Sequence, residues 1–188
     1  MEIDKRLVSH LGEKYKNFSN LKIINDSILK INLEVFGENL RIVGNLPYNI
    51  SSSILFYLNS FSHLIIDSHL MLQKEFVDRM VAEPGSSKYG RLSVMIQNKW
   101  DIKKIFDIEP ESFNPKPKVS SSFISMWLKE ESIVPKEFMQ QFNFIVRKAF
   151  QQRRKKLRNS LKEVFNENQI SIAGINSNLR AEDLKITD

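Results

Sequence analysis

Residues 40–48 read Leu-Arg-Ile-Val-Gly-Asn-Leu-Pro-Tyr, an apolar run that ends in an amide and a proline turn. The length and the aliphatic content of the run predict a buried strand over residues 40–45. Pro47 restricts the backbone directly after it. Residues 51–61 begin with serines that can cap a helix, and their apolar side chains recur at helical spacing. The stretch therefore predicts a strand, a tight turn and a helix in succession.

The same alternation extends on both sides of this stretch. We expect helices over residues 4–15, 74–82 and 91–100, and strands over residues 21–26, 63–72, 105–108 and 122–128. Alternating strands and helices favour a parallel-type α/β sheet covered on both faces. From residue 133 onward no strand signal remains, so we predict a domain boundary near residue 132 and a small helical domain over 133–188.

The composition excludes several classes of protein. The 188 residues include no Cys, which rules out disulfides, thiolate metal sites and Cys nucleophiles, and the three His lack metal-ligand spacing. We therefore predict no metal. No apolar run reaches the roughly 18 residues of a membrane span, and residues 1–6 mix acidic and basic side chains without an apolar stretch. We expect a cytoplasmic protein with no membrane partner.

The positive charge is concentrated in one place. Between residues 147 and 158 there are seven basic side chains and no acidic one; outside this basic segment, 21 basic residues face 22 acidic ones. A local excess of this kind is typical of a site for a polyanion, although a solvated helix face is the alternative. If residues 147–158 formed one helix, their arginines would face solvent or phosphates. The seven are Arg147, Lys148, Arg153, Arg154, Lys155, Lys156 and Arg158.

The motif Asn45-Leu46-Pro47-Tyr48 suggests a chemistry, because it resembles the signature of methyltransferases that modify exocyclic amines of bases. Such an amine is a poor nucleophile, since its lone pair is drawn into the ring. Two acceptors, the Asn45 side chain and the Leu46 carbonyl, can orient the amine toward a methyl group. The Tyr48 ring can stack on an extruded base, worth about 1–3 kcal/mol. The alternative is an ordinary Asn-x-Pro turn after a strand.

Over nearly its whole length the chain resembles the small-subunit ribosomal RNA adenine dimethyltransferases (the KsgA/RsmA type). Seven matching stretches occur in the expected order. They are Glu-Ile-Asp at 2–4, Gly-Asn-Leu-Pro-Tyr-Asn-Ile-Ser at 44–51, Met-Leu-Gln-Lys-Glu at 71–75, Tyr-Gly-Arg-Leu-Ser-Val at 89–94, Phe-Asn-Pro-Lys-Pro-Lys-Val-Ser-Ser at 113–121, Ala-Phe-Gln-Gln-Arg-Arg-Lys-Lys-Leu-Arg-Asn-Ser-Leu at 149–161 and Arg-Ala-Glu at 180–182.

The resemblance implies a fold and a reaction. The fold is a Rossmann-like α/β methyltransferase sheet in residues 1–132, followed by a helical RNA-binding domain. The reaction is dimethylation of the exocyclic amines of adjacent adenines in small-subunit (16S-type) ribosomal RNA, with S-adenosyl-L-methionine as methyl donor. The partner is the precursor of the 30S subunit, in ribosome biogenesis, and the enzyme is expected to act as a monomer.

The resemblance also implies roles for individual residues. Glu2 would accept hydrogen bonds from the ribose of the methyl donor, Asp26 would contact its adenine, and Asn45 would contact donor and target. Phe113 would close the other side of the target adenine. From the pattern alone, Asp26 fits a turn residue as well, and a Phe before a Pro-x-Pro segment is often core. The catalytic set is Asn45, Leu46, Pro47, Tyr48 and Phe113; the RNA-binding set is Lys116, Lys118 and the seven bases of the basic segment.

One element of the family pattern is absent from this sequence. The Gly-x-Gly loop that approaches the methionine part of the donor lies upstream of the position of Glu2 in the family, and the family's last helix is cut short. We therefore expect a fragment, truncated at the amino terminus and slightly at the carboxyl terminus, that by itself binds S-adenosylmethionine weakly or not at all. The alternative function is a non-catalytic RNA-binding assembly factor of the same fold.

Overall fold

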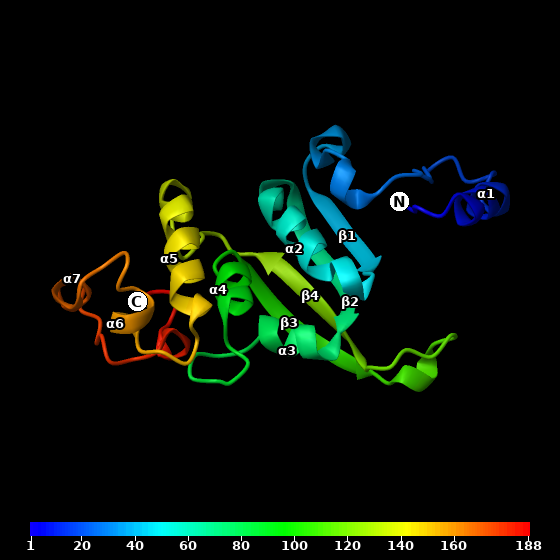
Figure 1. The fold of residues 1–188 in the computed structure, drawn as a ribbon. Coiled ribbons are helices and arrows are strands. Elements are labelled where there is room, and N and C mark those ends of the chain that lie inside the picture. Colours follow the sequence, from blue (N-terminus) through cyan, green and yellow to red (C-terminus); the bar gives the residue numbers. More distant parts are fainter.

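The structure, a computed structural model, describes residues 1–188. Its centre is a four-stranded sheet in the order β1-β2-β4-β3 (Figure 1). The strands are β1 (Leu40–Asn45), β2 (Ile65–Gln73), β3 (Trp100–Ile108) and β4 (Ser121–Leu128). The helices are α1 (Lys5–Lys14), α2 (Ser51–Ser60), α3 (Lys74–Met80), α4 (Arg91–Gln97), α5 (Met139–Gln151), α6 (Leu157–Ser160) and α7 (Glu167–Ile172).

The sheet is mixed rather than purely parallel. Strands β1 and β2 are parallel, with Asn45 opposite Met71, and β4 is antiparallel to both β2 and β3. It follows that β1, β2 and β3 point the same way and that only β4 is reversed. The expectation of a parallel sheet is wrong for β4, because no α-helix connects β3 to β4 and a crossover helix is what returns a strand in parallel. The carboxyl ends of β1, β2 and β3 meet the start of β4 at one border, called here the carboxyl edge.

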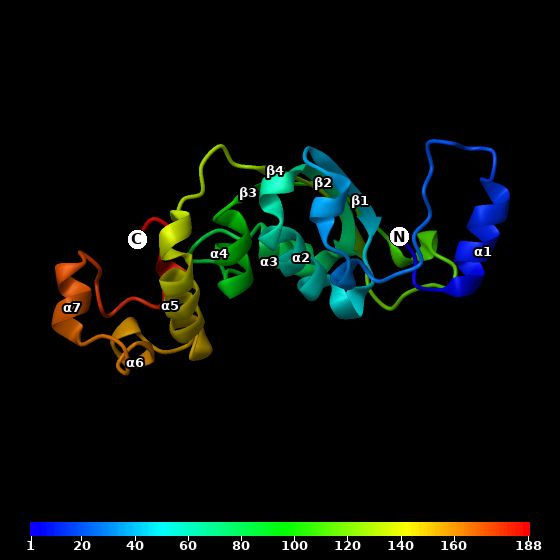
Figure 2. The same cartoon turned by 90° about the horizontal axis from the view of Figure 1, so that it is seen from above.

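Helices α2, α3 and α4 all lie on the same face of the sheet (Figure 2). Between them and the strands is a core of 16 buried residues, in which Leu70, Leu72 and Ile124 are completely buried. On the opposite face the side chains of Val43 and Ile66 are 71% and 50% exposed. The expected cover on both faces is therefore wrong for this chain. The parallel strands β1, β2 and β3 follow one another across the sheet in chain order. Because connections between parallel strands are right-handed, the helices of both connections lie on the same face of the sheet.

Residues 21–26 do not form the expected buried strand. The segment is extended but lies outside the sheet, and Leu21 is 48% exposed. It lies beside the amino-terminal residues, where the Glu2 N–H donates to the Ile24 carbonyl at 3.0 Å. One backbone hydrogen bond does not make a ladder, so an apolar run alone was not sufficient to define a strand here.

The other element predictions inside the sheet region hold, with shifted ends. The expected helix 91–100 ends at Gln97, and Trp100 already begins β3. Trp100 is buried and its Nε1 donates to the Asn59 side-chain oxygen at 2.9 Å, which fixes it to the end of α2. The helical spacing of apolar residues extends in the sequence to Trp100, but in the structure Trp100 is the first residue of a strand.

The carboxyl-terminal part is helical and packs on α4. Val94 and Met95 of α4 belong to one buried cluster with Val146 of α5, while Leu92 and Ile96 of α4 belong to the sheet core. Helix α4 thus joins both parts, and the boundary near residue 132 stays a prediction. The longest helix of the chain, α5, has 13 residues, and none of the helices could cross a membrane.

The basic segment is not a single helix. Helix α5 ends at Gln151, and α6 begins only at Leu157. Between them the backbone turns, because Leu157 and Arg158 donate their N–H groups to the carbonyls of Leu179 and Ser177 at 2.8 and 3.1 Å. These tertiary hydrogen bonds compete with continuation of the helix and end it. The bases consequently do not share one helix face.

Candidate active site at the carboxyl edge

The turn after β1 is held tightly against the sheet. The Leu46 N–H donates to the Met71 carbonyl at 3.0 Å, which adds one more bond to the β1–β2 pairing. The Ser51 hydroxyl, in the first turn of α2, donates to the Pro47 carbonyl at 2.9 Å. Leu46 is 9% exposed and belongs to the core. Its side chain therefore anchors the turn while the neighbouring residues remain accessible.

An open cavity of about 310 Å³ lies at this turn. It brings Phe113, from the segment between β3 and β4, to the motif that follows β1. All five residues of the predicted catalytic set line it. The lining residues are Asn45, Leu46, Pro47, Tyr48, Phe113, Pro115 and Pro117.

Two hydrogen-bond acceptors in this cavity have no partner within the protein. The Asn45 side chain is exposed and makes no hydrogen bond. The carbonyl of Leu46 accepts none either, whereas the next carbonyl, that of Pro47, accepts from both Ser51 and Ile50. A planar amine with two N–H donors matches a pair of free oxygens on adjacent residues. The turn can therefore bind an amino group without breaking any bond of its own.

Tyr48 is fixed by a residue of β4, the strand on the far side of β2. Its hydroxyl lies 2.5 Å from the Ser121 hydroxyl, at the start of β4. Ser121 is completely buried, and it pairs with Gln73 on one side and with Ile108 on the other. The aromatic ring thus lies at the cavity, and its hydroxyl is attached to the first residue of an interior strand of the sheet.

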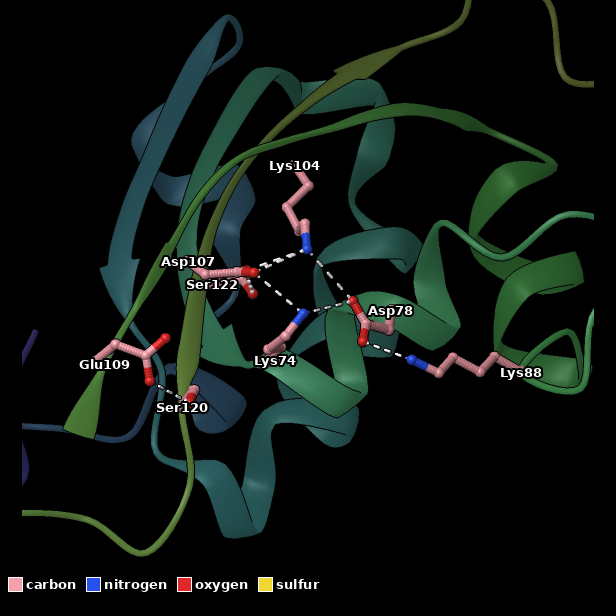
Figure 3. Close-up of polar contacts among 8 residues, drawn as sticks. All are labelled: Lys74, Asp78, Lys88, Lys104, Asp107, Glu109, Ser120 and Ser122. Carbon is pink, nitrogen blue, oxygen red and sulfur yellow. Dashed lines mark hydrogen bonds and ion pairs between the residues drawn. The ribbon is translucent and has the colours of Figure 1, made fainter.

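A network of ion pairs lies on the helix-covered side of the carboxyl edge (Figure 3). Lys74, at the start of α3, and Lys104 of β3 both lie 3.1 Å from the Asp107 carboxylate and 3.5 Å from that of Asp78. The Ser122 hydroxyl donates to Asp107 at 2.5 Å. This hydrogen bond and then those from the lysines lower the pKa of Asp107 to about 2. The network ties α3, β3 and β4 together beside the cavity.

The structure does not bring Glu2 and Asp26 into this cavity, although it brings their segments together. Asn25 donates its side-chain N–H to the carbonyls of Glu2 and Ile3 at 2.9 and 3.1 Å. One oxygen of Glu2 accepts from the backbone N–H groups of Ile3 and Asp4, and one oxygen of Asp26 accepts from that of Ser27. The second oxygen of each carboxylate is free. No group of three or more His, Asp or Glu is placed to hold a metal ion.

Most of the bases predicted to bind RNA have partners in the protein. Arg153 donates to the Glu182 carboxylate at 2.7 Å and to the Ser87 carbonyl. Lys148 pairs with Glu163 at 2.9 Å, Arg158 with Glu167 at 3.6 Å and Lys116 with Glu111. Lys156 donates to Asn178, and the Arg147 guanidinium lies 5.7 Å from the centre of the Phe144 ring. The sequence of residues 147–158 alone could not predict these partners, because the acidic residues lie in other segments of the chain.

Three of the predicted bases have no such partner. Arg154 and Lys155 are exposed in the turn between α5 and α6, and Lys118 is exposed beside the Pro-x-Pro segment. None of the three side chains makes a hydrogen bond or an ion pair within the protein. They are the bases of the predicted set that stay fully available to a polyanion.

Sequence reasoning missed several residues at the carboxyl edge. The sequence places Ser121, Ser122 and Lys74 only in matching stretches or at the start of an element, without a role at the site, and it singles out Asp107 in no way. A signal was present for the serines. Three consecutive hydroxyl residues at 120–122 occupy the start of a strand, where side chains alternate between the two faces.

Comparison with known proteins agrees with this arrangement. The family model described as "Ribosomal RNA adenine dimethylase" matches residues 1–188. A "Ribosomal RNA small subunit methyltransferase A" from Nitrosomonas eutropha is 42% identical over 186 residues, which are 99% of this chain and 72% of that protein. A solved dimethyladenosine transferase from Plasmodium falciparum aligns with a TM-score of 0.81 at 26% identity, covering 99% of this chain and 76% of that one.

A more distant structure supports the fold alone. The 23S rRNA methyltransferase ErmE aligns with a TM-score of 0.74 at 22% identity, over 99% of this chain and 76% of that one. Sheet, helices and the cavity at the carboxyl edge thus define an α/β methyltransferase fold. Within that class, the chain belongs to the ribosomal RNA adenine dimethylase family.

Proposed function

We propose that this protein transfers methyl groups from S-adenosylmethionine to the exocyclic amines of adjacent adenines in small-subunit ribosomal RNA. The substrate is a precursor of the small ribosomal subunit, in the cytoplasm. The observation that carries this proposal is the pair of free acceptors, the Asn45 side chain and the Leu46 carbonyl, at a cavity lined by Tyr48 and Phe113. The family to which the chain belongs supports the same reaction.

The two acceptors bind the amine and orient it. When the Asn45 oxygen and the Leu46 carbonyl each accept one N–H of the target amine, the nitrogen is drawn toward a pyramidal geometry. Its lone pair then points out of the plane of the base. The acceptors are already in position before the amine arrives, because the turn is fixed by the Leu46–Met71 and Ser51–Pro47 bonds. Preorganised dipoles of this kind lower the barrier without any reorganisation during the reaction.

The aromatic side chains hold the base itself. Tyr48 and Phe113 both line the cavity, and the ring of Tyr48 is attached through its hydroxyl to Ser121. An adenine must leave its stack to reach such a cavity, and stacking on aromatic rings offsets part of that cost. Phe113 lies next to Pro115 and Pro117, which restrict the backbone of the segment that carries it.

The residues present fit the adenosine part of the methyl donor. Glu2 and Asp26 each keep one carboxylate oxygen free, and their segments lie side by side. Carboxylates suit ribose hydroxyls and an adenine amine, which are hydrogen-bond donors. When bound, S-adenosylmethionine would supply a methyl group on a positively charged sulfur. The chain's own contribution is to hold the amine in line with that methyl group.

We assign contact with RNA phosphates first to Arg154, Lys155 and Lys118, because they have no partner in the protein. Arg147, Lys148, Lys156, Arg158 and Lys116 can join them only by giving up or sharing a present contact. Arg153 is assigned a structural role instead. Guanidinium groups match phosphates in geometry, and each phosphate contact releases counterions from the RNA.

The test compares two asparagines of the same turn. Asn45→Ala removes one of the two acceptors, whereas Asn49→Ala removes an exposed amide that makes no hydrogen bond and does not line the cavity. In a version extended at the amino terminus by the family's Gly-x-Gly segment, methyl transfer from labelled S-adenosylmethionine to small subunits that lack these methyl groups is measured together with RNA affinity. We expect Asn45→Ala to lower kcat by about 10²–10³ with RNA binding retained. Asn49→Ala should retain the activity of the unmodified protein.

Two results would contradict the proposal. If Asn45→Ala weakened RNA binding tenfold but left turnover intact, Asn45 would be a binding residue without a role in the transfer. If the extended protein without substitutions bound small-subunit RNA but transferred no methyl group, the alternative of a non-catalytic assembly factor would replace the enzyme.

A further inference from the structure

Three consecutive serines lie where the chain enters β4 at the carboxyl edge: Ser120 directly precedes the strand, and Ser121 and Ser122 begin it. Each makes a different side-chain hydrogen bond. We propose that this serine run is a positioning device that sets the two aromatic walls of the cavity, Tyr48 and Phe113, relative to each other. The inference rests on the proposed function, because it assigns these serines a role in holding the target base. They are positioning residues and do not themselves touch the substrate.

Ser121 acts on the Tyr48 wall. Its hydroxyl lies 2.5 Å from the Tyr48 hydroxyl, and its side chain is completely buried. Its backbone cannot shift easily, because β4 is paired on both sides at this point, with Gln73 of β2 and Ile108 of β3. The Tyr48 ring is half-buried and belongs to a short 3-10 helix at Tyr48–Ile50. A hydrogen bond to a fixed partner therefore removes rotational freedom that packing alone leaves to this ring.

Ser120 and Ser122 act on the Phe113 wall from the other side of the strand. The Ser120 hydroxyl donates to the Glu109 carboxylate at 3.0 Å, and that of Ser122 donates to Asp107 at 2.5 Å (Figure 3). These bonds join the end of β3 to the start of β4. Phe113 lies on the segment between them, so both ends of the segment that carries it are fixed by side chains.

The ion-pair network holds this second anchor in place. Asp107 accepts from Ser122 and pairs with Lys74 and Lys104, and the backbone N–H of Lys74 donates to the Ser120 carbonyl at 3.0 Å. The start of α3 is thereby attached to the same serine run. Side chains alternate between the two faces of a strand, so Ser121 points to the face opposite that of its two neighbours. This is why Ser121 bonds to Tyr48 while Ser120 and Ser122 bond to the end of β3.

The experiment removes the Tyr48 anchor from either end. Ser121→Ala deletes one hydroxyl and Tyr48→Phe deletes the other, while the aromatic ring remains. Each should lower kcat by about tenfold, the order of effect of one net hydrogen bond, with the KM for RNA changed less than about twofold. The double variant should lose no more than either single variant, because both changes remove the same bond.

A matched control separates positioning from general damage to the strand. Ser125→Ala removes another buried hydroxyl of β4, one that contacts His69 at 2.9 Å far from the cavity. It should leave kcat unchanged. Ser120→Ala tests the other wall and should lower kcat without the non-additivity that links Ser121 to Tyr48.

A spectroscopic measurement tests the bond without reference to methyl transfer. The chain has only four tyrosines, so the Tyr48 signal of ring-labelled protein is assigned from Tyr48→Phe. Ser121→Ala should shift that signal and Ser125→Ala should not. An unmoved Tyr48 signal, or equal losses of kcat in Ser121→Ala and Ser125→Ala, overturns the positioning role. A shifted signal, together with no methyl transfer by the version extended with the Gly-x-Gly segment, would contradict the proposed function but would support the contact between Ser121 and Tyr48.

Discussion

Adjacent arginines of the basic segment should respond in opposite ways to the same substitution. Arg153 reaches back into the protein, where its Nε donates to Glu182 at 2.7 Å and its terminal nitrogen donates to the carbonyls of Ser86 and Ser87. Arg154 is exposed and has no such contact. Glutamine in place of either removes the charge and keeps a long polar side chain. The pair therefore distinguishes a structural base from one that is free for RNA.

The expected size of the effect follows from the exposure of the groups. The Arg153 side chain is 40% exposed and that of Glu182 is 20% exposed. Charge-assisted hydrogen bonds contribute about 1.5–3 kcal/mol when sheltered and exposed ion pairs about 0.2–1 kcal/mol, so a half-sheltered contact is worth about 1–2 kcal/mol. For a chain of this length that lowers the Tm by about 2–8 °C. Arg154→Gln should stay within about 0.5 kcal/mol of the unmodified protein.

RNA binding should show the reverse order. We expect Arg154→Gln to reduce the slope of log affinity against log salt by about 0.7–0.9, the loss of one phosphate contact. Arg153→Gln should leave that slope unchanged, because its charge is already used within the protein. Thermal unfolding and affinities measured at several salt concentrations, on the same two preparations, give both quantities.

The reasoning fails if the two variants behave alike. If Arg153→Gln left the Tm unchanged and reduced the salt slope of RNA affinity, RNA would draw Arg153 away from Glu182. The contact between Arg153 and Glu182 would then contribute little to the stability of the fold. An unchanged slope in Arg154→Gln would make the turn between α5 and α6 a solvated surface. The RNA contact would then have to be sought around Lys118.

The remaining predictions concern the carboxyl edge and the core. Asp107 has a pKa of about 2, below its ordinary 3.8, so it stabilises the fold above about pH 4 and this contribution is lost as the pH falls toward 2. Asp107→Asn should therefore flatten the acid limb of stability measured by denaturant unfolding between these pH values. Leu70→Ala should cost about 2–5 kcal/mol in the same assay, since Leu70 is completely buried. In Gly44→Ala a new Cβ would meet the Leu46 side chain at 3.2 Å, and kcat should fall by up to about tenfold with RNA affinity kept.

The sequence predicted the elements of the fold better than their arrangement. Strands 40–45 and 122–128 and the helix after residue 51 are local patterns, and they form nearly where expected. The reversal of β4 and the single covered face depend on connections, which hydrophobic periodicity does not encode. Residues 21–26 have the composition of a strand, but without a ladder beside them they stay outside the sheet.

For the candidate site too, local features were predicted from the sequence and tertiary contacts were not. Residues of the Asn45–Tyr48 motif and Phe113 were foreseen from motifs, and the fold brings them to one cavity. The partners of the basic residues were not foreseen, because an ion pair such as Arg153–Glu182 joins positions far apart in sequence. A run of basic residues without acidic ones is a property of the local sequence. Whether each basic side chain is free to bind RNA depends on the tertiary structure.

The reversal of β4 is the feature that makes the cavity possible. Had β4 run parallel to its neighbours, its end near Leu128 would lie at the carboxyl edge, and the segment that leaves β3 would have to cross to the far border of the sheet to reach its start. In the antiparallel direction, the segment that leaves β3 enters β4 at the same edge, so Phe113 stays beside the turn after β1. The first residues of β4 are then also at the site, which places Ser121 within hydrogen-bond distance of Tyr48. One strand direction thus supplies both the second aromatic wall and the anchor of the first.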